Sequence, residues 1–352
     1  MTSSPVLGVL LHAIGGLAAA SFYIPFRKVK GWSWETYWLV NGFASWIIVP
    51  WVVSLITVPD TVGILSASPP KTLALCFLFG ALWGVGGLTF GLSVRYLGMS
   101  LGYALALGAC AAFGTLVPPL LKNELPGMMA KPDGQVVLLG VLMSLVGIAV
   151  CGRAGILKER ELPDSSKKLT IKEFDFKKGF WVALFCGVMS ACMSFGIEAG
   201  KPIADLAVEH KAPPLWQNGP IFIVIMAGGF MTNFIWCVIL HFQNQSAPQY
   251  LKPQEGGSLP INYLFSVLAG TIWYLQFMFY GMGSTQLGRQ FSFSSWTLHM
   301  AFIIIFSNIW GLLFHEWKAV SRPTHYWIRA GIAVLIVSTI IVGWGNWLAS
   351  AK

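Results

Sequence analysis

The sequence predicts an all-α membrane protein in which ten transmembrane helices form two inverted repeats of five. Three observations support this prediction. The chain of 352 residues is 55% hydrophobic and only 11% charged, with a mean hydropathy of +0.67, whereas soluble domains carry roughly 25% charged residues. Apolar stretches long enough to cross a bilayer recur along the chain. Residues of the first half reappear in the second half in the same order.

The apolar stretches are separated by short polar connections, and tryptophan and tyrosine gather at their ends, as is typical of membrane–water interfaces. A bilayer core of about 30 Å needs roughly 20 apolar residues per helix. The first stretch lacks a basic leader and is too long for a cleavable signal peptide, so it counts as the first span. We predict spans at residues 5–27, 35–57, 72–94, 98–121, 135–152, 179–201, 218–241, 260–284, 294–314 and 327–348.

One long polar connection divides the chain into a first repeat at 1–153, a charged linker at 154–178 and a second repeat at 179–352. The connections after odd-numbered spans carry 16 of the 23 lysines and arginines. Because cytoplasmic loops are enriched in these residues, we expect the linker in the cytoplasm and both termini in the periplasm. Membrane orientation also accounts for the net charge of +9, so no nucleic-acid partner is expected.

The repeat is clearest at tryptophan and lysine, because a chance match of these residues within apolar sequence is less expected than one of glycine or alanine. Trp83 matches Trp273 at an offset of 190 residues, and Lys28 matches Lys201 at an offset of 173. Because each half has an odd number of spans, the two halves must enter the membrane in opposite orientations. Inverted repeats are typical of secondary transporters, whose substrate site lies near the midplane at the interface between the repeats.

Six motifs lie in order along nearly the whole chain. They are Phe22–Thr36, Arg95–Ser100, Arg153–Gly155 with Leu157–Arg160, Ala199–Pro202, Trp273–Phe277, and Trp296 with Leu298–Met300. Together they resemble the signatures of the bacterial L-rhamnose–proton symporter family. The resemblance implies the drug/metabolite transporter fold in the bacterial inner membrane, and rhamnose uptake driven by the proton gradient. Several polar positions depart from the enterobacterial pattern, which leaves the exact sugar open. In this chain those positions are Gly87, Thr89, Glu198, Ser284, Gln286 and Ser292.

A sugar site needs aromatic faces for the apolar side of the ring and a few hydrogen-bonding groups. Pseudo-symmetry could place Trp83 and Trp273 across one cavity. Gln276 is costly in lipid unless it faces protein or water. The alternative is that the tryptophans are packing or interfacial residues. The substrate-binding candidates are Tyr23, Trp83, Trp273, Tyr274, Gln276, Trp296 and His299.

Ionisable residues within spans are few and therefore informative. Glu198, His299 and His12 are the candidates for proton coupling, with His299 slightly favoured because histidine titrates near neutral pH. Glu198 can instead pair with Lys201, and either histidine can be a packing residue. Lys28 and Lys201 are repeat mates that can also extend their charge to the interface.

The sequence gives no support for an enzyme. It contains no HExxH motif, no paired carboxylates within a span and no phosphate-binding glycine loop. The six cysteines lie in apolar stretches without metal-ligand spacing. We therefore expect no metal or cofactor, the proton as coupling ion, and a sugar and membrane lipid as partners. A transporter of another deoxy-sugar or small metabolite on the same fold is the main alternative.

Overall fold

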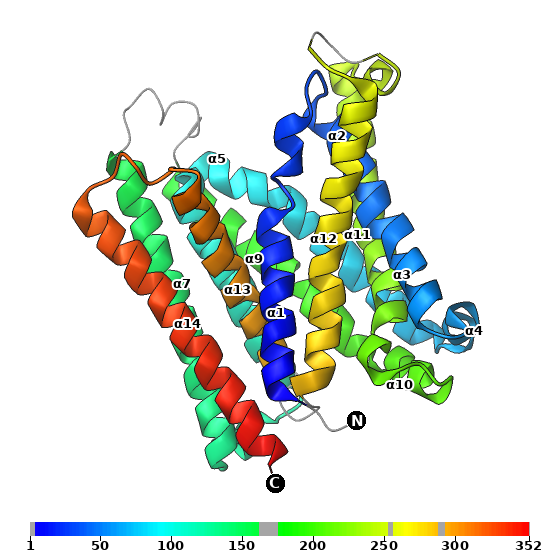
Figure 1. Cartoon of the computed structure of the whole chain (residues 1–352), viewed down its shortest axis with the longest axis vertical. Helices are drawn as coiled ribbons and strands as arrows, with labels where there is room; N and C mark the ends of the chain where they lie inside the picture. Colours follow the sequence, from blue (N-terminus) through cyan, green and yellow to red (C-terminus); the bar gives the residue numbers. More distant parts are fainter. Residues whose placement is uncertain (1–3, 162–174, 253–255, 288–292, 352) are drawn as a thin grey trace. The chain divides into compact units, whose positions relative to one another are not determined.

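The computed structural model describes residues 4–161, 175–252, 256–287 and 293–351, and within these ranges the chain is helical without strands (Figure 1). Ten segments of the described chain are long and apolar enough to cross a membrane, which confirms the predicted class. They are Pro5–Lys28, Trp34–Thr57, Pro70–Leu97, Ala104–Leu121, Pro132–Glu161, Phe176–Glu209, Pro214–Asn244, Leu259–Leu287, Ser294–Leu313 and Arg322–Ser350.

The ends of the predicted linker belong to helices. Helix α7 (Pro132–Glu161) continues beyond the expected end at residue 152, and α9 (Phe176–Ala199) begins before the expected start at 179. The extension of α7 contains two arginines, two glutamates and one lysine among its nine residues, and these residue types favour helix even where the chain is too polar for the bilayer. Residues 162–174 of the linker lie outside the described residues.

The third and fourth spans belong to one helical element, α5 (Pro70–Leu121). A Cβ atom on Gly102 would lie 3.1 Å from the carbonyl oxygen of Ser93. In a straight α-helix nine residues span about 13.5 Å, so the chain turns back between these two positions. Glycine at 102 permits this close approach, and α5 therefore supplies two crossings.

Residue contacts divide the chain into two compact units, each of which draws on both halves of the sequence. Unit 1 comprises Met1–Leu17, Gly86–Phe195 and Met282–Lys352, and unit 2 comprises Ala18–Val85 and Gly196–Gly281. Four helices contribute to both units: α1 (Pro5–Ser21), α5, α9 and α12 (Leu259–Leu287). The units differ from the predicted repeats, whose inverted symmetry is a separate property and stays a prediction.

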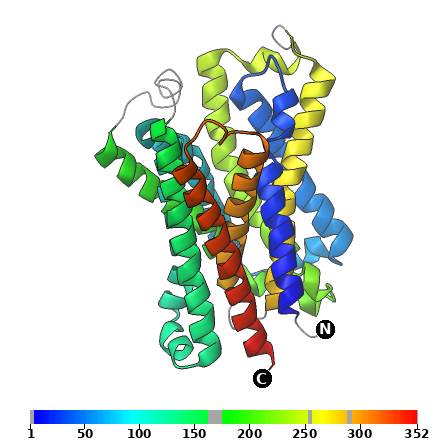
Figure 2. The ribbon, with the colours of Figure 1, turned by 60° about the vertical axis from the view of Figure 1, so that its left-hand side comes forward.

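Unit 1 is built on the pairing of α7 with α14 (Arg322–Ser350), seen as the neighbouring green and red helices in Figures 1 and 2. Small residues permit the close approach that stabilises helix pairs in membranes. A Cβ atom on Gly140 would lie 2.6 Å from Val342, and one on Gly147 would lie 2.8 Å from Leu335. Unit 1 also contains α6 (Leu125–Met129) and α13 (Ser294–Leu313), which contact α7 and, for α13, α14.

Unit 2 is centred on α11 (Gly219–Asn244), which packs against the second span. That span consists of α2 (Trp34–Gly42), a π-helical segment η2 (Phe43–Ile48) and α3 (Val49–Thr57). The unit also contains the short helix α4 (Thr61–Ala67) and four further short connecting elements. They are η1 (Pro25–Lys28), α10 (Lys201–Glu209), η3 (Pro214–Trp216) and η4 (Ala247–Tyr250).

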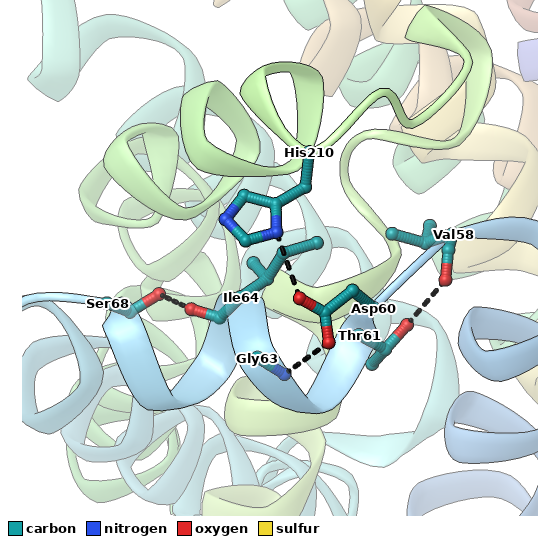
Figure 3. A network of polar contacts seen from close by, with 7 residues as sticks. All are labelled: Val58, Asp60, Thr61, Gly63, Ile64, Ser68 and His210. Atoms are coloured by element: carbon teal, nitrogen blue, oxygen red, sulfur yellow. Dashed lines mark hydrogen bonds and ion pairs between the residues drawn. The ribbon is translucent and has the colours of Figure 1, made fainter.

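Asp60 begins the short helix α4 (Thr61–Ala67) between the second and third spans (Figure 3). Its backbone is left-handed, with φ of 55°, and its carboxylate accepts a hydrogen bond from the Gly63 N–H at 3.1 Å. The other carboxylate oxygen lies 3.0 Å from Nδ1 of His210. A Cβ atom on Gly63 would collide with the Asp60 carboxylate, so glycine is needed for this cap.

Hydrogen bonds between connecting segments agree with the predicted number of crossings. In unit 2, the Trp32 indole after the first span donates to the Gln249 carbonyl after the seventh, at 2.7 Å. In unit 1, the Ser321 hydroxyl after the ninth span donates to Glu161 at the end of the fifth, at 2.7 Å. An even number of spans separates the members of each pair, so they belong on the same side of the membrane.

Candidate functional site

The aromatic cluster of unit 2 contains the two tryptophans that the repeat singled out. The cluster consists of Phe22, Trp38, Trp46, Trp83, Trp273 and Phe277. The rings of Trp83 and Trp273 meet edge to face with centroids 5.5 Å apart. This contact corrects the expectation that they face each other across a cavity, because it leaves no room for a sugar ring between them. Trp273 also stacks on Phe277 at 4.9 Å.

Three further predicted residues adjoin this cluster in different environments. Tyr23 is 50% exposed, and its ring lies 6.3 Å from that of Trp38, at the open edge of the cluster. Tyr274 is only 1% exposed. Gln276 is 5% exposed and donates a hydrogen bond to the Trp273 carbonyl at 3.0 Å, which satisfies part of its amide.

The structure brings the two intramembrane histidines together in unit 1. His12 on α1 and His299 on α13 are both fully buried, and their ring centroids lie 6.4 Å apart. Nothing in the sequence spacing indicated this pairing. Trp296 lies 6.1 Å from His299, ring to ring, and its indole N–H donates to the Cys110 carbonyl at 3.1 Å. This environment is typical of a packing tryptophan, and the substrate role of Trp296 stays a prediction.

The predicted pairing of Glu198 with Lys201 is present in unit 2. The carboxylate and ammonium groups lie 2.6 Å apart, with the two side chains 21% and 44% exposed. Glu198 lies in the last turn of α9 and Lys201 begins α10, so the ion pair links the adjacent ends of these two helices. Lys28, the repeat mate of Lys201, ends the 3-10 helix η1 and is exposed.

A hydrogen-bonded network at the start of the second span was not predicted from the sequence, because Glu35 lies at the edge of that span and not within it. The Glu35 network consists of Glu35, His241, Asn244, Ser246 and Tyr250. Glu35 accepts hydrogen bonds from the Ser246 hydroxyl at 2.6 Å and the Asn244 amide at 3.0 Å. The Ser246 hydroxyl also lies 2.7 Å from His241 Nδ1.

Tyr250 completes this network from the segment that follows α11. Its hydroxyl lies 2.9 Å from His241 Nε2. Burial raises the pKa of the Tyr250 phenol, so the hydroxyl stays protonated and can donate to the imidazole. With Nε2 as the acceptor, His241 carries its proton on Nδ1 and donates a hydrogen bond to the Ser246 hydroxyl. The Ser246 hydroxyl in turn donates a hydrogen bond to the Glu35 carboxylate. Every member of the chain of hydrogen bonds is thereby satisfied.

A second missed group of polar residues lies further along the same span. Asn41 and Ser45 are completely buried, and Trp46 is 3% exposed. The sequence did contain a signal for Asn41, since an amide side chain inside an apolar span is the feature that singled out Gln276. What the sequence could not show is which of these amides finds a partner.

Comparison with known proteins places this chain among relatives of matching length. The family described as L-rhamnose-proton symport protein matches residues 1–349. Proteins named L-rhamnose-proton symporter from Cronobacter sakazakii and Pectobacterium atrosepticum are 41% and 40% identical to this chain, with 98% of this chain and 99% of each relative covered. A protein of the same name from Yersinia pestis is 39% identical with the same coverage. The similarity extends over all ten candidate spans.

Proposed function

Since the chain belongs to the L-rhamnose-proton symport protein family, a family of transporters rather than enzymes, we propose that it imports L-rhamnose together with protons. The observation that carries this proposal is the match over residues 1–349 combined with 39–41% identity to relatives of that name. The location is the bacterial inner membrane, with both termini in the periplasm, as the distribution of lysine and arginine favours.

The aromatic cluster of unit 2 is the proposed sugar platform. Aromatic rings bind the apolar C–H side of a sugar while hydroxyls are read by polar groups. Trp273 is partly exposed, stacks on Phe277 and has the Gln276 amide one turn further along α12. Tyr23 adds a phenol at the open edge. The sugar would contact the outer faces of this cluster, since Trp83 and Trp273 touch each other.

The pair of histidines in unit 1 is the proposed proton carrier. Two imidazolium rings at 6.4 Å in a buried site would repel each other, so the pair binds a single proton shared between coupled sites. Glu198 is the less suitable carrier, because its carboxylate is already engaged in a contact of 2.6 Å with the Lys201 ammonium group.

The central experiment is uptake by purified protein in liposomes, with a panel of monosaccharides and with or without an inward proton gradient. We expect L-rhamnose to accumulate only with the gradient and to leak out when a protonophore is added. Preferential uptake of a different deoxy-sugar would favour the alternative substrate, and uptake that ignores the proton gradient would contradict symport.

Substitution of Trp273 tests the sugar platform. Trp273→Ala should weaken sugar binding by about 1–3 kcal/mol, and Trp273→Phe should lose less because it retains a ring. Gln276→Leu should reduce selectivity among hydroxyl stereoisomers, since an unmet hydrogen bond penalises the correct sugar. Unchanged affinity in a folded Trp273→Ala protein would remove Trp273 from the site.

Substitution of His299 tests proton coupling. His299→Gln should abolish accumulation against a gradient while sugar exchange between the two sides continues, because exchange needs no net proton movement. Glu198→Gln should retain uphill uptake. If both variants still drive proton-dependent accumulation, the carrier lies elsewhere.

Orientation can be tested by labelling single cysteines at Ser3 and Ser165, both outside the described residues, in a cysteine-free background. An impermeant maleimide applied to intact cells should label position 3 only. The reverse pattern would place the termini in the cytoplasm.

A further inference from the structure

Three neighbouring residues of unit 2 bury polar atoms that have no hydrogen-bond partner within the described part of the chain. The Asn41 set consists of Asn41, Ser45 and Trp46, at the junction of α2 with η2. Within the described ranges, no hydrogen bond is made by the two amide atoms of Asn41, the Ser45 hydroxyl or the Trp46 indole N–H. Two of these residues are completely buried, and Trp46 is 3% exposed.

Other buried asparagines in unit 2 are satisfied, so the burial of an amide here does not by itself leave it unbonded. Asn262 accepts from the Lys30 N–H at 3.1 Å and donates to the Lys30 carbonyl at 2.7 Å. Asn233 accepts from the Trp38 indole and donates to the Gly229 carbonyl. A buried polar group without a partner opposes folding, so the Asn41 set is expected to gain partners in some state of the working protein.

Local helix geometry gathers the Asn41 set on one side of the span. In an α-helix a residue five positions on points about 140° away. The π-helical segment closes hydrogen bonds across five residues, as from the Val49 N–H to the Ala44 carbonyl, and such a wider turn brings Trp46 round towards the side of Asn41. Isolated π-helical turns occur frequently at functional sites.

The side of the span that carries these residues lies against α12 and the aromatic cluster. The Trp46 ring lies 6.1 Å from Trp273 and 6.2 Å from Trp83, centroid to centroid. A Cβ atom on Gly270 would lie 2.5 Å from the Asn41 carbonyl oxygen. Glycine therefore lets α12 approach the second span without a side chain that would interlock the two helices.

These groups match the chemistry of a sugar. The Asn41 amide offers donors and an acceptor, Ser45 offers both, and Trp46 offers one donor beside an aromatic ring. We propose that the Asn41 set binds the hydroxyl groups of the transported sugar next to the Trp273 ring, when α12 separates from the second span at Gly270. This proposal rests on the proposed function and adds residues to its sugar site.

The test compares two buried asparagines of the same unit. Wild type, Asn41→Leu and Asn262→Leu are placed in nanodiscs, and binding of tritiated L-rhamnose and thermal unfolding are measured for each. Asn41→Leu should weaken rhamnose binding roughly tenfold or more while the unfolding temperature stays the same or rises, since no protein hydrogen bond is lost. Asn262→Leu should lower the unfolding temperature and leave the affinity of the folded protein within about twofold, because its bonds are to the Lys30 backbone alone.

Each outcome has a distinct meaning. Asn41→Leu protein that binds rhamnose as tightly as wild type overturns this inference while the proposed function stands. Wild-type protein that binds no rhamnose overturns the proposed function, and the inference falls with it. If Asn41→Leu does not fold, then Asn41 has a structural role, and Ser45→Ala becomes the test of sugar binding. A folded Ser45→Ala protein should bind rhamnose more weakly than wild type. Unchanged affinity in that protein would overturn the inference.

Discussion

The second membrane span contains two buried polar regions, which differ in whether their side chains have hydrogen-bond partners. At its start, Glu35 belongs to a network in which hydroxyl, amide, imidazole and phenol groups are all hydrogen-bonded. Two helical turns later, the polar atoms of the Asn41 set have no partner among the described residues. The first region has the character of a structural clamp between the second span and the end of α11.

The difference teaches that burial alone does not distinguish structure from function in this protein. A satisfied network stabilises one conformation, because each removed group leaves others without partners. A buried polar group without a hydrogen-bond partner lowers the stability of the conformation in which it is buried. On our proposal it is retained because it contacts the sugar in a different conformation. The two regions should therefore respond to substitution in opposite ways. Four predictions follow this contrast from a fully bonded buried site to an exposed polar contact, and the pair of serines compares the two regions directly.

The largest effect is expected for Glu35→Leu. It leaves the Ser246 hydroxyl and the Asn244 amide without their acceptor, and hydrogen bonds to a charged group are the stronger kind, so the free energy of unfolding should fall by about 3 kcal/mol. Equilibrium unfolding in mixed detergent micelles measures this change. Glu209→Leu, at an exposed position, is the control and should change stability by no more than about 0.5 kcal/mol. Equal effects at the two positions would show that the network is not a clamp.

Gln249→Leu should have the next largest effect. The Gln249 side-chain oxygen accepts from the Ser33 N–H at 2.7 Å and from the Thr36 hydroxyl at 2.9 Å. Loss of both bonds at this buried site should lower the unfolding free energy by about 2 kcal/mol. Gln249→Leu protein that is as stable as wild type would show that these two bonds do not contribute to stability.

A pair of serines provides the most direct contrast between the two regions. Ser246→Ala removes the link between Glu35 and His241 and should destabilise the protein by about 1 kcal/mol. Ser45→Ala removes a hydroxyl that has no hydrogen-bond partner among the residues that the structure describes, and it should leave stability unchanged or slightly raised. The same unfolding assay compares them, and a larger loss in Ser45→Ala than in Ser246→Ala would reverse the assignment of the two regions.

The smallest effect is expected for the polar contact between the Asp60 carboxylate and the His210 imidazole (Figure 3). The Asp60 and His210 side chains are 58% and 34% exposed, so water can replace the hydrogen bond between them. His210→Gln should change the unfolding free energy by less than about 0.5 kcal/mol. A loss comparable to that of Gln249→Leu would show that exposure is a poor guide to the strength of polar contacts here.

The sequence by itself determined the membrane class, the ten candidate spans and the family. Each of these rests on local composition or on motifs that persist along the chain: a run of roughly 20 apolar residues crosses a bilayer whatever its neighbours are. The pairing of Glu198 with Lys201 was also predictable, because residues three apart share a helix face.

Only the tertiary structure decided which distant side chains meet. The contact of Trp83 with Trp273, the approach of His12 to His299 and the network around Glu35 join residues from different helices. Apolar periodicity places a residue in a span, but it does not decide which neighbour packs against it. The same limit applies to Asn41 and Asn262, which look alike in sequence. Hydrogen-bond satisfaction depends on the atoms that surround a side chain after the helices pack, and that environment separates a structural amide from a candidate for binding.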